Sequence, residues 1–212
     1  MQVNEQNLIN DLSAMVRIPS VNTFGNADPK RPAEEEMAQF FETRMKEIGL
    51  DVYSAHVSDG RRNVWGRLKG AGNGPTIMLA GHLDTVGIPG YENPFEPTIL
   101  DGCIHGRGSC DMKAGLAVYL EVARILVASD APLNGDVIIA GVVDEEDAMI
   151  GSKDFGENGP HIDCAIVAEP SKLAISIAHR GQICLFIRTY GKSTHSSVPE
   201  NGINAIYHMS AV

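Results

Sequence analysis

Apolar residues near the amino terminus recur with the period of an amphipathic helix. The residues that form this stripe are Leu8, Leu12, Met15 and Val16. Asn4 stands in the N-cap position before the stripe, and Pro19 follows it. We therefore expect a first helix that begins after Asn4 and ends before Pro19.

A second helix is predicted between Pro32, which is favoured in a first turn, and Gly49, which is favoured as a C-cap. Its apolar face comprises Met37, Phe40, Phe41, Met45 and Ile48. The acidic run 34–36 falls in the first turn, where negative charge complements the helix dipole. We interpret this run as solvent-exposed surface and not as part of a site.

Short apolar runs bounded by turn residues predict β-strands further along the chain. Two such strands are expected at 51–57 and 63–68, joined by a turn at 58–60. Residues 99–104 have the pattern of a small hairpin with an Asp-Gly turn. The stretch from 86 to 97 is rich in Gly and Pro, and loops of this length inside a domain are commonly functional.

Three longer apolar runs predict buried strands, at 76–80, 137–143 and 162–168. A strongly apolar helix is expected at 112–128, and another helix is expected to begin near Gly151. Strands that alternate with helices form βαβ units, so the sequence predicts an α/β fold with a mainly parallel sheet.

The pattern changes near residue 181. We expect a strand at 183–187, a glycine-led turn at 191–195 and an amphipathic helix that begins at Asn204.

Composition narrows the possible partners. The 212 residues carry a formal net charge of −10, which argues against a nucleic acid or an anionic membrane as partner. No apolar run approaches the roughly 20 residues that a membrane span needs, and the polar start of the chain does not resemble a signal peptide. The four cysteines, Cys103, Cys110, Cys164 and Cys184, form no C-x-x-C pair. This favours reduced thiols in a cytoplasmic protein over a thiolate metal site.

Polar residues follow each of the three predicted buried strands. His82 and Asp84 follow the first strand, Glu145 and Glu146 the second, and Glu169 the third. Ligands in α/β sheets bind at the carboxyl ends of the strands, so we expect these side chains to meet at one edge of the sheet.

Each of these residues also has an ordinary explanation. His82 and Asp84 could hydrogen-bond within a loop, and the acids at 144–147 could be a solvated face. Asp111 stands before the helix at 112–128, where it could be an N-cap. The coincidence of three strand ends and one helix start favours a common site.

One imidazole and several carboxylates repel each other at close range unless cations lie between them. This ligand set suits zinc, or a pair of zinc or similar divalent ions that share a carboxylate and activate water. Such a site also needs a carboxylate to accept the proton from water. The neighbours Glu145 and Glu146 can divide these two roles, and Asp84 could hold the second nitrogen of His82.

Four motifs occur in the order GHLDTV (81–86), GRGSCDMKAG (106–115), VVDEED (142–147) and AEP (168–170). They resemble the motifs of the dinuclear zinc deacylases and exopeptidases, a family that includes acetylornithine deacetylase, succinyl-diaminopimelate desuccinylase, aminoacylase and glutamate carboxypeptidase. Ala114 departs mildly from this pattern, because a glycine is common at its position.

The resemblance implies a three-layer domain of the zinc-exopeptidase type, with a central, mostly parallel mixed sheet. It assigns residues 1–180 to the N-terminal part of this metal-binding catalytic domain. Residues 181–212 would then begin a smaller α+β lid or dimerisation domain.

The resemblance also implies a ligand set for two zinc ions, for which Co²⁺ or Mn²⁺ could substitute. His82, Asp111 and Glu169 would hold one ion, and Asp111 would bridge to a second ion that Glu146 also holds. One further ligand is expected for the second ion. In the family it is a histidine that follows the lid domain, and none of the other histidines here lies in a matching motif.

Further roles follow from the same resemblance. Glu145 would be the general base and acid, and Asp84 would orient His82. The peptide bond after Asp111 would be cis. His195 would reach the active site of a partner subunit and stabilise the oxyanion of the tetrahedral intermediate. Without the resemblance, His195 is more simply explained as a surface loop residue.

We therefore expect the N-terminal half of a longer cytoplasmic, homodimeric enzyme of amino-acid metabolism. Its reaction would be metal-dependent hydrolysis of the amide bond in an N-acyl amino acid or a short peptide, with a leaning towards the acetylornithine and succinyl-diaminopimelate branch. The alternative is a truncated or non-catalytic fragment that keeps the fold and binds metal or ligand without turnover.

Overall fold

The chain forms two compact units, residues 1–174 and residues 175–212. The computed structural model describes residues 2–24, 34–129, 131–178, 180–181, 183 and 185–212. No helix among them is long and apolar enough to cross a membrane.

The first two helices confirm the predicted pattern. Helix α1 (Glu5–Val16) begins after Asn4, whose side chain accepts hydrogen bonds from the amides of Gln6 and Asn7. Helix α2 (Glu35–Ile48) ends at Gly49, which has a left-handed φ of 102° that glycine adopts without steric cost. The predicted role of Pro32 lies outside the described residues.

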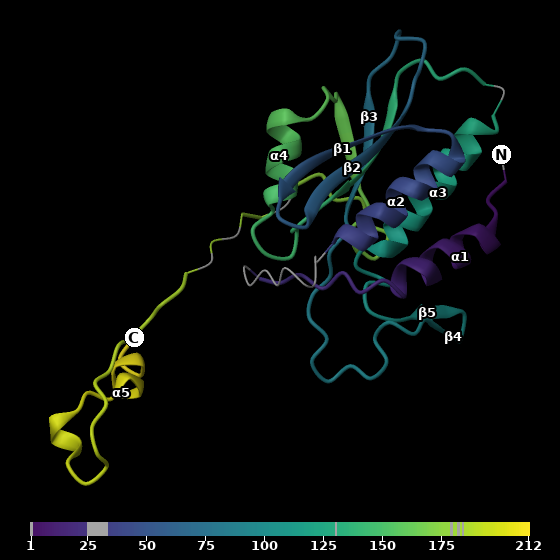
Figure 1. The fold of residues 1–212 in the computed structure, drawn as a ribbon. Helices are drawn as coiled ribbons and strands as arrows, with labels where there is room; N and C mark the ends of the chain where they lie inside the picture. Colours follow the sequence, from purple (N-terminus) through teal and green to yellow (C-terminus); the bar gives the residue numbers. More distant parts are fainter. Residues whose placement is uncertain (1, 25–33, 130, 179, 182, 184) are drawn as a thin grey trace. The chain divides into compact units, whose positions relative to one another are not determined.

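A five-stranded mixed sheet forms the centre of the first unit (Figure 1). Its strands lie in the order β1-β2-β6-β3-β7. They are β1 (Asp51–Ser58), β2 (Arg61–Leu68), β3 (Ile77–His82), β6 (Val137–Val142) and β7 (Cys164–Val167). β6, β3 and β7 run parallel, while β2 is antiparallel to both β1 and β6. The expected mixed α/β fold is thereby confirmed.

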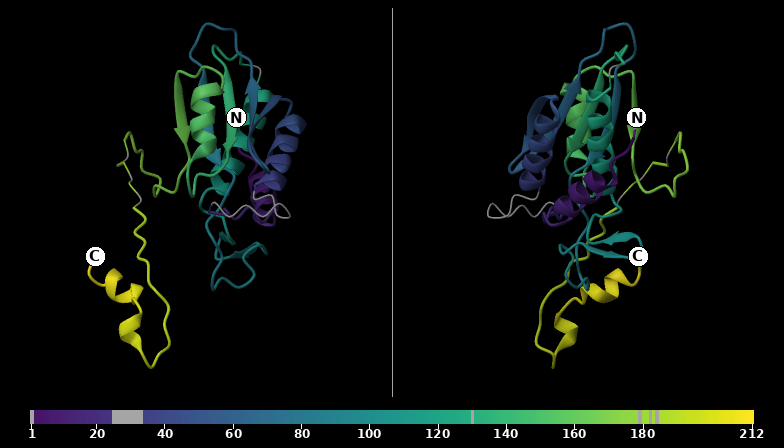
Figure 2. Two further views of the ribbon diagram at one scale, coloured as in Figure 1. Left: turned by 60° about the vertical axis from the view of Figure 1, so that its left-hand side comes forward. Right: turned by 90° about the vertical axis from the view of Figure 1, so that its right-hand side faces the viewer.

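Helices cover both faces of this sheet and complete three layers (Figures 1 and 2). Leu79 of β3 and Ile139 of β6 pack in a core with α1, α2 and α3 (Lys113–Val127). Their neighbours Met78 and Ile138 pack in a second core with Phe155 of α4 (Ile150–Asn158). Because successive strand side chains point to opposite faces, these continuous apolar runs suit burial on both sides.

Strand β7 corrects one prediction. The run at 162–168 was expected to be a buried strand, but all four residues of β7 are exposed, including Ile166 at 56% and Val167 at 55%. β7 stands at the end of the strand order and pairs with β3. The apolar sequence pattern predicts that a strand forms. Whether that strand is buried depends on whether the helices on both faces of the sheet extend to its edge strand.

A small hairpin confirms another prediction. β4 (Thr98–Leu100) and β5 (Cys103–His105) pair antiparallel around Asp101 and Gly102. These two turn residues have φ values of 50° and 75°, the positive values that a two-residue hairpin turn requires.

The second unit is formed by residues 175–212. The strand expected at 183–187 is not observed among the described residues of that range, which are exposed and have no ladder partner. An apolar run becomes a strand only where a neighbouring strand satisfies its backbone. The predicted helix after Asn204 is present as α5 (Ala205–Met209), with the Asn204 side chain accepting from the amide of Ile206. A short 3₁₀ helix, η1 (Pro199–Asn201), precedes it.

Candidate metal centre

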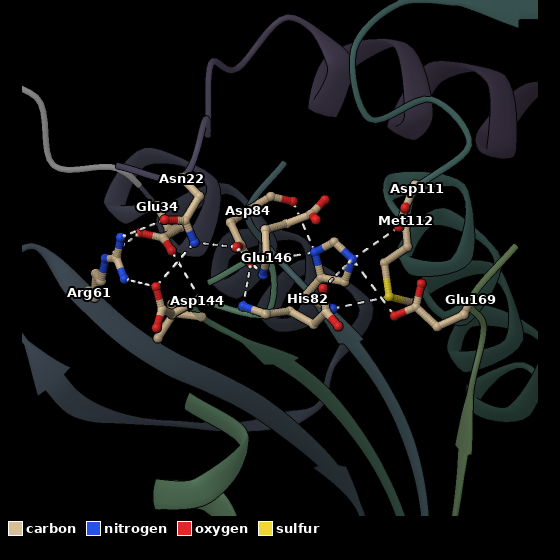
Figure 3. Close-up of polar contacts among 12 residues, drawn as sticks. Asn22, Glu34, Arg61, His82, Asp84, Asp111, Met112, Asp144, Glu146 and Glu169 are labelled. Carbon is tan, nitrogen blue, oxygen red and sulfur yellow. Dashed lines mark hydrogen bonds and ion pairs between the residues drawn. The ribbon is translucent and has the colours of Figure 1, made fainter. Parts of the chain in front are cut away.

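The polar residues that follow the three parallel strands come together at one edge of the sheet (Figure 3). His82 is the last residue of β3, Glu145 and Glu146 follow β6, and Glu169 follows β7. The parallel pairing of β3 with both β6 and β7 places these three strand ends side by side.

Asp111 joins this group from the start of α3. Its carboxylate oxygen Oδ1 lies 3.1 Å from Nε2 of His82. The N-cap position of α3 is occupied by Met112, so the interpretation of Asp111 as an ordinary N-cap is wrong. The peptide bond between Asp111 and Met112 is cis, as the resemblance implied.

Two sets of side chains could each hold a metal ion. One consists of His82, Asp111 and Glu169, and the other of His82, Glu145 and Glu146. In each set the candidate ligand atoms lie within 4.8 Å of one another. His82 is buried, whereas the side chains of Asp111, Glu145 and Glu169 are between 41% and 51% exposed. The imidazole of the group is therefore buried, whereas its carboxylates are accessible to solvent.

The electrostatics of the group reflect an excess of carboxylates. Burial lowers the pKa of His82, but the carboxylates of Asp111 and Asp84 outweigh this effect and raise it to about 11. Burial, together with the negative charges of Asp111 and Glu145, raises the pKa of Glu169 to about 7 although His82 opposes the shift. Burial likewise raises the pKa of Glu146. A divalent cation would relieve the repulsion that these shifts express.

The residues fit a metal by their chemistry as well. Oxygen Oε1 of Glu146 is buried and has no hydrogen-bond partner in the structure. Buried polar atoms are nearly always paired, so an orphaned carboxylate oxygen beside an imidazole indicates a missing positive partner. One histidine and several carboxylates are ligands that zinc accepts.

Asp84 contacts the site with both its main chain and its side chain. Its carbonyl oxygen lies 3.0 Å from Nδ1 of His82, closer than its carboxylate oxygen Oδ1 at 3.4 Å. The carboxylate accepts hydrogen bonds from the amides of Glu145 and Glu146 at 3.1 and 3.0 Å. Asp84 thus binds both the histidine and the segment that carries the two glutamates.

The interpretation of the acidic run 34–36 as solvent-exposed surface is wrong for Glu34. It is fully buried, and its carboxylate accepts from the amide of Asp144 and forms an ion pair with Arg61. Burial raises its pKa to about 7, although the charge of Arg61 lowers it. A signal was available: Glu34, the N-cap of α2, lies three and seven positions before Met37 and Phe41, in line with the apolar face of the helix.

Two buried residues beside the centre, Asn22 and Arg61, lie in none of the four sequence motifs, whereas Asp144 lies in the motif at 142–147. Asn22, Arg61 and Asp144 are buried and hydrogen-bonded to one another. They come from a loop, the start of β2 and the segment that follows β6. Their proximity arises from tertiary contacts between distant segments.

His195 belongs to the second unit. It is exposed, and its Nδ1 lies 2.8 Å from the hydroxyl of Ser197 and accepts from the Ser197 amide. The structure therefore groups the other six predicted site residues in the first unit, and the role of His195 stays a prediction.

Comparisons with known proteins find related sequences and structures. Residues 78–197 match Peptidase family M20/M25/M40. The chain is 35% identical over 182 residues to acetylornithine deacetylase of Vibrio atlanticus (strain LGP32). That alignment covers 84% of this chain and 46% of the relative, so the chain spans about half the length of the curated relative it matches.

Two solved structures illustrate the shared fold. A tripeptidase from Staphylococcus aureus subsp. aureus Mu50 superimposes with a TM-score of 0.68 at 21% identity, covering 100% of this chain and 56% of that one. A Zn-dependent exopeptidase from Parabacteroides distasonis has a TM-score of 0.54 at 16% identity, with coverage of 79% and 61%.

Proposed function

The chain belongs to Peptidase family M20/M25/M40, and from this premise we propose that it serves metal-dependent hydrolysis of an amide bond in an N-acyl amino acid or a short peptide. The observation that supports this proposal is the meeting of His82 with the carboxylates of Asp111, Glu145, Glu146 and Glu169 at one sheet edge.

The proposed metals are two zinc ions, with Co²⁺ or Mn²⁺ as substitutes. His82, Asp111 and Glu169 would hold one ion, and Asp111 and Glu146 would contribute to the second. The solved relative from Parabacteroides distasonis is described as Zn-dependent, which supports the choice of metal. Bound divalent ions supply polarisation of a substrate carbonyl and acidification of water.

The two adjacent glutamates are suited to different tasks. Glu146 has a buried oxygen without a hydrogen-bond partner, which suits a ligand. The Glu145 side chain is 41% exposed, with Oε2 3.9 Å from Nε2 of His82. We assign Glu145 as the general base that accepts a proton from the attacking water and returns it to the leaving amine. Asp84 would hold His82 and the Glu145 main chain in place.

The substrate class is proposed from the relatives. The curated relative is an acetylornithine deacetylase, so an N²-acylated basic amino acid is the first candidate, and a short peptide is the second. We further propose that residues 181–212 begin a lid domain in a cytoplasmic homodimer. There His195 would stabilise the oxyanion in the partner's site.

An activity assay tests the role of Glu145. The chain, loaded with Zn²⁺ or Co²⁺, is assayed with N-acetylornithine and with a tripeptide, alongside Glu145→Gln and the control Glu157→Gln. Glu157 lies on the exposed face of α4. We expect Glu145→Gln to lower kcat by about 10²–10⁴-fold, the usual contribution of a general base, and Glu157→Gln to have no effect.

Two other results have distinct meanings. Equal rates for the parent and Glu145→Gln would remove Glu145 from the mechanism. Stoichiometric metal binding by both proteins without turnover by either would favour the alternative, in which this chain binds metal but does not catalyse.

A further inference from the structure

A buried polar cluster lies beside the candidate metal centre (Figure 3). We call it the Arg61 cluster, and its members are Asn22, Glu34, Arg61, Asp84 and Asp144. Each member is at most 9% exposed. As defined, the cluster contains three carboxylates, one amide and one guanidinium. Asp84 and Asp144 lie in motifs that carry the family resemblance, and the other three members do not.

The cluster reaches the metal centre through Asp84. The two oxygens of its carboxylate accept hydrogen bonds from the successive amides of Glu145 and Glu146. A carboxylate can bind two adjacent amides in this way only in one orientation of its plane. That orientation determines where the main chain of the two glutamates lies.

Asn22 holds the carboxylate in that orientation. Its Nδ2 donates to Oδ2 of Asp84 at 2.7 Å and to Oδ1 of Asp144 at 3.1 Å. Its own oxygen accepts from the amide of Phe24 at 2.8 Å and from Nη2 of Arg61 at 3.3 Å. Every polar atom of this buried amide is therefore committed, which fixes its rotation.

Arg61 in turn binds the groups around Asn22. Its guanidinium donates to Asp144, to the hydroxyl of Thr23 and to the oxygen of Asn22, and it forms an ion pair with Glu34. A planar guanidinium with several donors suits such a fixed set of acceptors better than an ammonium group does. Its positive charge also lies beside the carboxyl groups of Glu34 and Asp144, which would otherwise repel each other.

We propose that Asn22 and Arg61 are positioning residues of the metal centre. They hold the Asp84 carboxylate against the amides of Glu145 and Glu146, and thereby place the two glutamate side chains opposite His82. The connection to metal binding rests on the proposed function, whereas the positioning of the main chain does not.

The chain contains a matched control for this role. Arg67, on the same strand β2, forms an ion pair with Asp136, which precedes β6. Arg61 pairs with Asp144, which follows β6. The Asp136 carboxylate also accepts a backbone amide, that of Gly70. The two arginine–aspartate pairs thus span the same two strands at opposite ends, and the Arg61 pair is the one beside the metal centre.

Amide hydrogen exchange in the metal-free chain tests the positioning directly. The exchange rates of the Glu145 and Glu146 amides are measured by NMR in the parent, Asn22→Ala, Arg61→Lys and Arg67→Lys. Each rate is divided by the parental rate of the same amide, and the Ile139 amide in the core of β6 is followed separately as a measure of global stability. We expect the ratio to rise about tenfold in Asn22→Ala, at least threefold in Arg61→Lys, and to stay within twofold in Arg67→Lys.

Co²⁺ binding tests the connection to the metal. Residues that orient metal ligands typically change metal affinity by about 10- to 100-fold. We therefore expect Asn22→Ala and Arg61→Lys to weaken Co²⁺ binding about tenfold and to alter its visible absorption spectrum, while Arg67→Lys matches the parent.

The outcomes separate the two proposals. A folded Asn22→Ala with parental exchange rates overturns the positioning role. If Asn22→Ala does not fold, Arg61→Lys decides in the same way, and failure of both to fold would assign the cluster to stability and overturn the proposal. Raised exchange ratios in the two variants, together with no Co²⁺ binding by the parent, would leave the positioning intact and refute the proposed metal function.

Discussion

The carbonyl oxygen of Asp84 lies 3.0 Å from Nδ1 of His82, closer than the Asp84 carboxylate, which is 3.4 Å away. The main chain therefore contributes strongly to the orientation of the imidazole, and Nε2 faces the carboxylates of Asp111 and Glu169. This arrangement leaves the Asp84 side chain available for the amides of Glu145 and Glu146.

Replacement of the Asp84 carboxylate should destabilise the folded chain. In Asp84→Asn, an NH₂ group would replace one of the two carboxylate oxygens that accept from the amides of Glu145 and Glu146. Two hydrogen-bond donors would then face each other without an acceptor between them. We expect a loss of about 1–3 kcal/mol in the free energy of unfolding, measured by urea denaturation.

Asp163→Asn is the control for that measurement. Asp163 also accepts a backbone amide, that of Thr76, but its side chain is 48% exposed. Water can replace the lost interaction there, so we expect a change of at most about 0.5 kcal/mol. Equal losses in the two variants would contradict the buried role of Asp84.

Metal binding should stabilise the chain through His82. A ligand present at 100 times its Kd, and bound by the native state alone, stabilises that state by about 2.7 kcal/mol. We expect Zn²⁺ to raise the Tm of the parent and of His56→Ala, because His56 is exposed on β1. His82→Ala should lose most of this increase. An equal Zn²⁺ response in His82→Ala would place the metal elsewhere.

The buried carboxyl group of Glu34 should make stability depend on pH. Burial raises its pKa from 4.5 to about 7, against the lowering effect of Arg61. Between pH 4.5 and about 7, the Glu34 carboxyl group is therefore protonated in the native state but ionised in the unfolded state. The stabilising contribution is therefore complete below pH 4.5 and disappears as the pH rises through 7, a loss of about 3 kcal/mol.

Glu34→Gln removes this titration. Relative to the parent, the variant should gain stability as the pH is raised from 5 to 8, when urea unfolding is followed at both values. The difference between the two proteins isolates Glu34, because all other titrating groups are shared. A difference that does not vary with pH would show that Glu34 is ionised throughout.

Two glycines of α4 should respond in opposite ways to alanine. A Cβ atom at Gly151 would lie 2.4 Å from the carbonyl oxygen of Val143, whereas nothing lies within 4 Å of one at Gly156. We expect Gly151→Ala to cost about 1–3 kcal/mol, because the backbone must shift. Gly156→Ala should stabilise by about 0.5–1 kcal/mol through helix propensity. Thermal unfolding of both variants checks the pair, and destabilisation by Gly156→Ala would refute it.

Much of the first unit was predictable because local patterns and the fold agree there. The caps of α1 and α2, Asn4 and Gly49, satisfy backbone groups a few positions away. The meeting of His82, Glu145 and Glu169 was predictable too, since alternation of strands with helices implies parallel neighbours whose carboxyl ends share an edge.

Other features escaped prediction because they depend on distant segments. Asn22 contacts Asp84 and Asp144, which lie 62 and 122 positions away. A buried asparagine has no local pattern that distinguishes it from one in a solvated loop. Glu34 was misread for a related reason: its charge indicated solvent, while its N-cap position, in line with the apolar face of α2, puts it against Arg61.

By itself, the sequence determined most elements of the first unit, the family and the residues that could bind a metal, because helix caps, apolar periods and motif order are local properties of the chain. The tertiary structure decided which side chains are buried, as the exposed β7 and the buried Glu34 show. It also decided how Asp84 divides its contacts between His82 and the two glutamates. Such contacts depend on the directions of side chains from separate segments, which packing determines.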